Sequence, residues 1–146
     1  MTQADFLKAP FPDPVALTGE DCAGPARFFN RELSWLAFNW RVVDEARNPA
    51  VPLLERVRFL SISATNLDEF YTVRVAGLRE LANEGNTTPS DDGRTPAEQL
   101  RLINADARRL MQSQQATWNH LKAELEAERI TVVTRSALRA AEKKLL

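Results

Sequence analysis

The break expected at Thr65 and Asn66 is the part of the sequence best suited, by residue type and spacing, to bind a small anionic ligand. The small polar side chains of residues 61–66 bond readily to nearby backbone, and apolar periodicity resumes at Leu67. We therefore expect a break or kink near residues 63–66, with a second helix that begins there and is capped by Thr65 or Asn66. The free N–H groups of such a helix start attract anions. The Asn66 amide also carries the donor and acceptor that match an adenine edge.

Simple helix capping is the favoured interpretation of Asn66 on the residues alone, and ligand binding is the alternative. Asp68 and Glu69 fit capping boxes that begin at Thr65 and Asn66, respectively. Because these two carboxylates are adjacent, they point about 100° apart on a helix and do not form a paired acid–base site. Their charges instead complement the helix dipole in the first turn.

The remaining reactive residue types predict no catalytic or metal site in this chain. Cys22 is the single cysteine, so no intrachain disulfide and no cysteine-based zinc site can form. His120 is the single histidine, and its position midway along an expected long helix indicates a surface or interface residue. The sequence contains no Walker-type or dinucleotide-binding glycine loop. We therefore assign no catalytic residue and no metal ligand here.

The charge balance disfavours a nucleic-acid-binding protein. The chain has 146 residues, with 19 basic and 20 acidic side chains and a net charge of −1. Several arginines of the first two expected helices could bind phosphates, but nearly as many acids lie between them, so a solvated, salt-bridged surface is predicted. These arginines are Arg27, Arg31, Arg41, Arg47, Arg56, Arg58, Arg74 and Arg79.

Three helix starts are readable from the sequence. Asn30 is the expected N-cap of a helix over residues 31–47, and Pro52 suits the first position of the next helix. Thr95-Pro96-Ala97-Glu98 has the pattern of a capping box with proline at the first helical position. The helix that follows is expected to run from about 96 to 129, which is about 50 Å at 1.5 Å per residue. A domain of this size must be elongated to contain it.

The ends of the chain have a different character. Residues 1–26 are interrupted by four prolines and two glycines and are expected to form an irregular arm, although Phe6, Leu7, Phe11, Val15 and Leu17 could pack it onto a neighbouring surface. Residues 130–133 form a β-like run, and Ser136 begins another expected helix. That helix reaches Leu146 without a cap, so we expect an N-terminal piece of a larger protein.

These patterns together predict an all-α fold, an elongated antiparallel helical bundle with one long helix. No apolar stretch approaches the length of a membrane span and no signal peptide is recognisable, which predicts a cytoplasmic protein and leaves association with a membrane surface open. The expected core consists of Leu33, Leu36, Trp40, Leu54, Val57, Phe70, Leu78, Leu110 and Leu121.

Three segments resemble the N-terminal domain of bacterial polyphosphate kinase, in the order expected for that family. They are NRELSWLAFN at residues 30–39, PLLERVRFL at 52–60 and NLDEFY at 66–71. The resemblance is dense over residues 28–81, and the helices expected over 95–146 fit that domain, so residues 27–146 are assigned to it. Ser61, Ser63 and Trp40 depart from the residue types usual there.

The resemblance implies a helical domain of an enzyme that reversibly transfers the terminal phosphate of ATP to polyphosphate. The phosphorylated histidine, the magnesium ligands and most ATP contacts would then lie in C-terminal domains absent from this chain, which alone would be inactive. In this family the asparagine of the NLDEF motif meets ATP, which makes Asn66 the expected ATP-binding residue. The expected partners are ATP, polyphosphate, the enzyme's own head and C-terminal domains, and a second copy in a homo-oligomer. The alternative is a helical interaction or dimerisation module without a ligand of its own.

Overall fold

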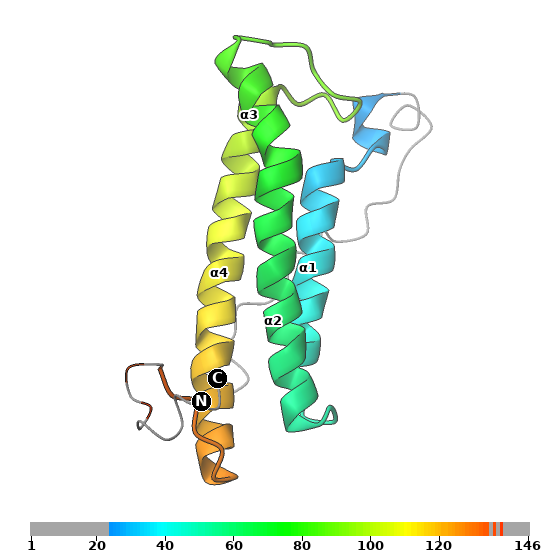
Figure 1. The fold of residues 1–146 in the computed structure, drawn as a ribbon. Helices are drawn as coiled ribbons and strands as arrows, with labels where there is room; N and C mark the ends of the chain where they lie inside the picture. The colour runs from blue at the N-terminus through cyan, green and yellow to red at the C-terminus, as the bar shows by residue number, and fades with distance from the viewer. Residues whose placement is uncertain (1–23, 135, 137, 139–146) are drawn as a thin grey trace.

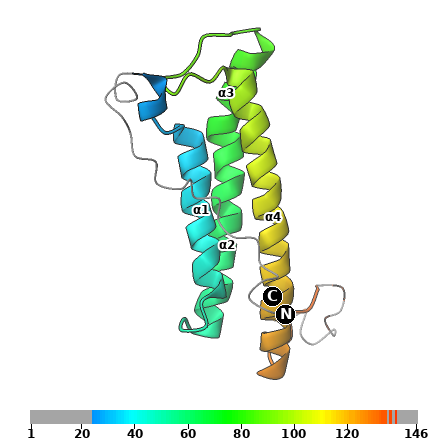
Figure 2. The same ribbon diagram turned by 180° about the vertical axis from the view of Figure 1, so that it is seen from behind.

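The computed structural model describes residues 24–134, 136 and 138, and these residues fold into a bundle of three packed rods (Figure 1). After a short 3₁₀ turn over Pro25–Arg27, α1 spans Arg31–Arg47 and α2 spans Leu53–Glu69. A π-helical segment, η3 (Phe70–Val75), continues directly into α3 (Ala76–Asn83), and α4 spans Pro96–Ala127. The chain of the second rod therefore runs through α2, η3 and α3, antiparallel to both α1 and α4 (Figures 1 and 2).

The predicted fold class is confirmed: the described residues are helical, with one long helix of 32 residues and no strand. Residues 130–134 have no regular secondary structure, so the β-like interpretation of 130–133 is wrong. Within the described part of the chain there is no neighbouring strand with which they could pair. The arm before Gly24 lies outside the described residues, and of the helix expected from Ser136 only Ser136 and Leu138 are described.

The predicted helix starts are confirmed, with one small correction. The Asn30 side chain accepts hydrogen bonds from the backbone N–H groups of Glu32 and Leu33, and Thr95 and Glu98 form the complete capping box. Pro52 is the N-cap of α2 instead of its first helical residue. The long helix ends two residues before the expected boundary, where Arg129 adopts a left-handed backbone with φ of 61°.

The core consists of two apolar clusters separated by a polar layer. The larger cluster contains nine buried residues, among them Leu36, Trp40, Phe70 and Leu110. The smaller cluster contains Ala46, Leu60 and Leu121. Between the two clusters lie three buried polar residues of α2 and α4, Ser63, Ser113 and Thr117, and the buried Asn39 of α1 joins them through its hydrogen bond to the Ser63 carbonyl oxygen.

Most of the predicted core is confirmed, and one member is wrong. Leu36, Trp40, Phe70, Leu110 and Leu121 are buried. Leu33, Val57 and Leu78 are half-buried at the edges of the clusters. Leu54 is 61% exposed. It lies in the first turn of α2 and lines an open groove with Glu124 and Ala127 at the end of α4, so its apolar side chain stays in contact with solvent.

The predicted break near residues 63–66 is wrong, because α2 runs through the segment without interruption. Ser63 is fully buried, and its hydrogen-bonding groups are satisfied by the neighbouring helices. Its Oγ accepts a hydrogen bond from Gln114 Nε2 at 2.8 Å, and its carbonyl oxygen accepts one from Asn39 Nδ2 at 3.0 Å. These tertiary bonds remove the competition with the helix that makes serine a weak helix former. The actual irregularity is the π-helical segment, which begins at Phe70.

Candidate functional site

Asn66 lies inside α2 and not at a helix start. Its carbonyl oxygen accepts a hydrogen bond from the backbone N–H of Phe70, as in a continuous helix. Thr65 is exposed and neither residue caps a helix, so both proposed capping boxes are wrong. The backbone N–H groups here serve the helix itself, and the helix-terminus argument for anion binding does not apply at this position.

The side of α2 on which Asn66 lies follows from helical spacing. Steps of three and four residues put Phe59, Ile62, Asn66 and Phe70 on one side of the helix. Val57, Ser61 and Ala64 instead line a groove toward α4, together with Met111 and Gln115. Asn66 is therefore on the side that faces α1.

Helical spacing puts two apolar residues of α1, Trp35 and Phe38, and two of α2, Phe59 and Ile62, on the sides of these helices that meet near Asn66. These four residues are here called the α1–α2 face. Phe38 is 54% exposed and Ile62 is 40% exposed, whereas Trp35 and Phe59 are half-buried. The Trp35 ring stacks on the Phe70 ring, with centroids 4.5 Å apart and planes 7° from parallel. This stack holds α1 against the turn of helix that follows Asn66.

The Asn66 amide is available to a ligand. The residue is half-buried, and among the described residues no group forms a hydrogen bond with its side chain. Asn39 of the buried polar layer is different, because its amide nitrogen is bonded to the Ser63 carbonyl oxygen and its side chain is fully buried. An unbonded amide beside aromatic and aliphatic side chains can recognise a planar ring with polar edges.

The π-helical segment directly follows the turn that carries Asn66 and shapes the far end of this region. Wide turns of this kind are frequent at functional sites, because one extra residue per turn redirects the side chains around it. Here Phe70 is buried in the core and contacts the Tyr71 ring edge to face, with centroids 5.9 Å apart. The Tyr71 hydroxyl donates to Asn104 Oδ1 of α4 at 2.9 Å, and burial raises the pKa of this tyrosine.

A network of polar contacts fixes the start of α1 relative to η3 and α4. Glu32 is buried, with Arg31 Nη2 at 3.0 Å and Arg74 Nη1 of η3 at 3.9 Å from its Oε1. Asn30 Nδ2 donates to Gln99 Oε1 of α4 at 2.9 Å. Sequence reasoning missed these positioning contacts, because charge pattern alone does not show which helix turns face one another.

The other sequence candidates do not assemble into a site. Asp68 and Glu69 are exposed at the end of α2. His120 Nε2 lies 2.9 Å from Glu124 Oε1, one helical turn away. Within residues 24–134, 136 and 138, no group of three or more histidine, cysteine, aspartate or glutamate side chains is arranged to hold a metal ion. Cys22 lies outside the described residues.

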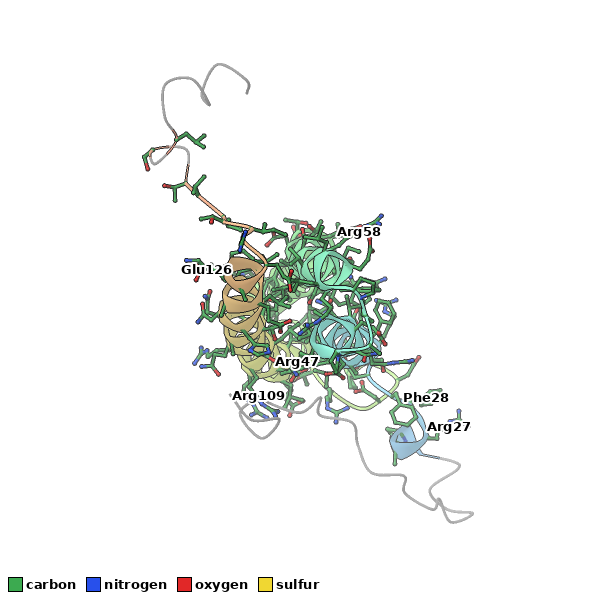
Figure 3. All side chains as sticks on the ribbon, turned by 90° about the horizontal axis from the view of Figure 1, so that it is seen from below. Arg27, Phe28, Arg47, Arg58, Arg109 and Glu126 are labelled. Atoms are coloured by element: carbon green, nitrogen blue, oxygen red, sulfur yellow. The ribbon has the colours of Figure 1, made fainter. Side chains whose placement is uncertain are left out.

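The prediction of a solvated arginine surface fails for Arg56. This residue is 5% exposed, and its Nη1 and Nη2 donate to Glu124 of α4 at 2.7 and 3.1 Å. Its Nε donates to the carbonyl oxygen of Ala46 at 3.1 Å, so one side chain joins α1, α2 and α4. Arg58, two residues further on, points outward from α2, as Figure 3 shows.

Residues 28–133 match the model of the polyphosphate kinase N-terminal domain. The chain belongs to this family. The matched range contains all three rods of the bundle and the NLDEFY motif that carries Asn66.

The curated relatives of this family member are polyphosphate kinases. The chain is 52% identical over 113 residues to the polyphosphate kinase of Erythrobacter litoralis, a match covering 77% of this chain and 15% of that protein. It is 46% identical over 108 residues to that of Synechocystis, covering 74% of this chain and 15% of the relative. The chain is 42% identical over 149 residues to the polyphosphate kinase of Mycobacterium tuberculosis, and this match covers 91% of this chain and 19% of that protein. The chain thus spans less than a fifth of these relatives' length. No solved structure matches it significantly.

No helix among the described residues is both long and apolar enough to cross a bilayer.

Proposed function

We propose that this domain helps to bind ATP in a polyphosphate kinase that reversibly transfers the terminal phosphate of ATP to polyphosphate. Asn66 contacts the nucleotide, and the α1–α2 face lies over it. The phosphorylated histidine, the magnesium ligands and most ATP contacts belong to the C-terminal domains of that enzyme. The assembled enzyme is a homo-oligomer. By itself the chain is expected neither to make polyphosphate nor to phosphorylate itself, because it contains no nucleophile–base pair that we can identify.

The observation that carries this proposal is the unbonded Asn66 amide beside an exposed aromatic surface. A half-buried amide that the fold does not use is available for hydrogen bonds to a purine edge. The aromatic and aliphatic side chains of the α1–α2 face provide uncharged contact area for the nucleotide. Membership of the polyphosphate kinase N-terminal domain family supports a role for this feature in such an enzyme.

The decisive experiment replaces Asn66 by Asp in a full-length enzyme that carries this domain. The substitution removes the NH₂ donor and brings negative charge toward an anionic nucleotide. A lost hydrogen bond of about 0.5–1.5 kcal/mol raises the apparent KM for ATP roughly 2- to 13-fold, and repulsion adds to this. Because Asn66 caps no helix, Asn66→Asp and Asn66→Ala are both expected to melt nearly like the parent.

Thr65→Asp is the matched control, because it introduces the same charge one residue away on an exposed side chain. Its KM for ATP should stay close to that of the parent enzyme. The proposal is contradicted if Asn66→Asp leaves ATP kinetics unchanged, or if both substitutions raise KM equally. A large loss of melting temperature in Asn66→Ala would show a structural role instead.

The exposed Phe38 and Ile62 also favour the second candidate function, an interaction surface. Large exposed apolar side chains mark binding faces when they are contiguous. Phe38→Ser in the full-length enzyme distinguishes the two functions. Altered oligomeric state in size-exclusion chromatography with unchanged ATP kinetics supports the interaction surface, and the two roles are compatible.

A further inference from the structure

Asn39 of α1 is a fully buried amide whose hydrogen-bonding capacity the fold uses only in part. Its Nδ2 donates to the Ser63 carbonyl oxygen of α2 at 3.0 Å, but its Oδ1 has no hydrogen-bond partner among the described residues. A buried oxygen without a partner makes an amide less favourable for stability than an apolar side chain of similar shape. Stability alone therefore does not account for an amide at this position.

The hydrogen bond that Asn39 does form joins α1 to α2 close to Asn66. The two helices lie side by side and antiparallel (Figures 1 and 2). Ser63 precedes Asn66 by three residues, which is just under one helical turn. Because the partner of Asn39 is a backbone carbonyl, the bond holds the backbone of α2 and not merely one of its side chains. It therefore restricts how α2 can slide or rotate against α1 in the turn that carries Asn66.

A second contact with α1 lies on the other side of Asn66 along the chain. The Trp35 ring, one helical turn before Asn39, stacks on the Phe70 ring with centroids 4.5 Å apart. Phe70 follows Asn66 by four residues. Asn66 thus lies between two points at which α1 holds the second rod, one polar and one aromatic. The Asn39 bond is the more directional of the two, because a hydrogen bond depends on distance and angle whereas stacked rings tolerate offsets.

We propose that Asn39 is a positioning residue for ATP binding, which acts by fixing where the Asn66 amide lies. This inference rests on the proposed contact of Asn66 with the nucleotide. Asn39 is fully buried, so it cannot touch the nucleotide itself and acts only through the placement of α2. The Asn66 side chain has no hydrogen bond with any described residue, so the position of the α2 backbone decides where its amide lies. Displacement of that amide weakens binding, because hydrogen-bond strength falls steeply with poor geometry.

Asn39→Leu in a full-length enzyme that carries this domain separates positioning from stability. The substitution removes the Nδ2 donor together with the unpartnered Oδ1, and the Ser63 carbonyl keeps its place in the continuous helix. We therefore expect a melting temperature close to that of the parent. The apparent KM for ATP should rise roughly 2- to 10-fold, which is no more than the loss of the Asn66 hydrogen bond itself would cause. The kcat should stay nearly unchanged, because a lost ground-state contact raises KM alone.

Two further variants control for folding and for the polar layer. Asn39→Ala is smaller than asparagine and should raise KM in the same way if Asn39→Leu does not fold; loss of folding in both overturns the proposal. Ser113→Ala is the matched control, because Ser113 of α4 is 2% exposed and its Oγ also has no hydrogen-bond partner among the described residues. It leaves the bond between α1 and α2 intact, so its KM for ATP should equal that of the parent. Equal rises in KM for Asn39→Leu and Ser113→Ala overturn the proposal, because general loosening would explain both.

A double-mutant cycle in the same enzyme tests whether Asn39 acts through Asn66. In the Asn66→Ala background, Asn39→Leu should raise the KM for ATP by less than about twofold, because the amide that it positions is gone. Full additivity of the two substitutions overturns the positioning role. So does an unchanged KM in Asn39→Leu when Asn66→Asp raises it, and in that case the nucleotide contact stands. An unchanged KM in Asn66→Asp contradicts the nucleotide contact, and the positioning role falls with it.

Discussion

The two halves of the bundle are stabilised in different ways. The half that contains the start of α1, η3 and the beginning of α4 has a cluster of nine buried apolar residues and the Trp35–Phe70 stack. The half that contains the α1–α2 turn has a cluster of only three buried apolar residues and depends on the Arg56–Glu124 ion pair. The larger cluster lies beside the η3 turn that follows Asn66.

This difference indicates where the domain is expected to be rigid. Close packing holds side chains and backbone in one arrangement, and more packed neighbours leave less room to relax. The proposed contact of Asn66 with ATP would gain from such support, because misplacement of the amide would weaken binding. The polar layer of Asn39, Ser63, Ser113 and Thr117 separates the two halves. Changes made in one half should therefore be only weakly coupled to the other.

The largest expected effect comes from a matched pair of leucines on α4. Leu110 and Leu121 are both fully buried, the first in the larger cluster and the second in the smaller. Leu110→Ala should cost about 4 kcal/mol and Leu121→Ala about 3 kcal/mol, because a cavity with fewer fixed neighbours collapses more easily. Urea denaturation measures both. A larger loss for Leu121 would refute the proposed difference between the halves.

Removal of the buried ion pair is expected to have the next largest effect. Glu124→Ala leaves the Arg56 guanidinium buried with one carbonyl partner. Breaking a fully buried pair costs about 3–5 kcal/mol. Because the Glu124 side chain is 34% exposed, solvent screens the pair and we expect about 2 kcal/mol.

Glu126→Ala is the control for the ion pair. It removes the partner of Lys122, at 3.9 Å, from an exposed position on the same helix. Exposed pairs contribute about 0–1 kcal/mol. Equal losses for the two glutamate variants in denaturant melts would show that Arg56 does not depend on Glu124.

The capping box at the start of α4 tests the half of the bundle that contains the larger cluster. Thr95 Oγ1 accepts from the Glu98 backbone N–H, and Glu98 accepts from the Thr95 backbone N–H at 2.9 Å. Thr95→Ala should cost about 1 kcal/mol, because one N–H loses its partner. Thr88→Ala in the preceding loop is the control and should change the free energy of unfolding by less than half as much. An unchanged Thr95→Ala melt would contradict the prediction.

The smallest expected effect depends on pH. Burial raises the pKa of Asp106, although the hydrogen bond from Trp40 and the charge of Arg109 oppose this. A carboxyl whose pKa is higher in the folded than in the unfolded state binds its proton more tightly when folded. Its favourable contribution is therefore present at acid pH and is lost as pH rises through the folded pKa. Asp106→Asn should be about as stable as the parent at acid pH and more stable near neutrality.

Asp92→Asn is expected to change the pH dependence of stability in the opposite direction. Burial alone would raise the pKa of Asp92, but hydrogen bonds from Ser90, Arg94 and Asn30 outweigh it and lower the pKa. The stability that this carboxylate contributes is present above its unfolded pKa and is lost as pH falls through the folded pKa. Asp92→Asn should thus be less stable than the parent near neutrality and equal to it in acid. Parallel pH profiles of unfolding free energy for the two variants would disprove these assignments.

Local chemistry alone determined the helix starts. Asn30 and Thr95 each satisfy backbone N–H groups within three residues, and Pro49 follows the end of α1, so no distant contact is needed to place these boundaries. Apolar spacing likewise determined the buried stripes of α1 and α4, including Leu36, Trp40 and Leu110.

Only the tertiary structure decided where the helix between Ser63 and Val75 stays regular and where it becomes irregular. The small polar residues favour a break in isolation, but Gln114 and Asn39 satisfy Ser63 from other helices and α2 continues. The irregularity moves to η3, where Phe70 must reach both the core and the Trp35 ring. Asn66 consequently keeps the amide that the sequence singled out, but presents it from the side of a helix instead of from its start. The physical reason is that hydrogen bonds between helices and close packing outweigh helix propensities of under about 1 kcal/mol per residue.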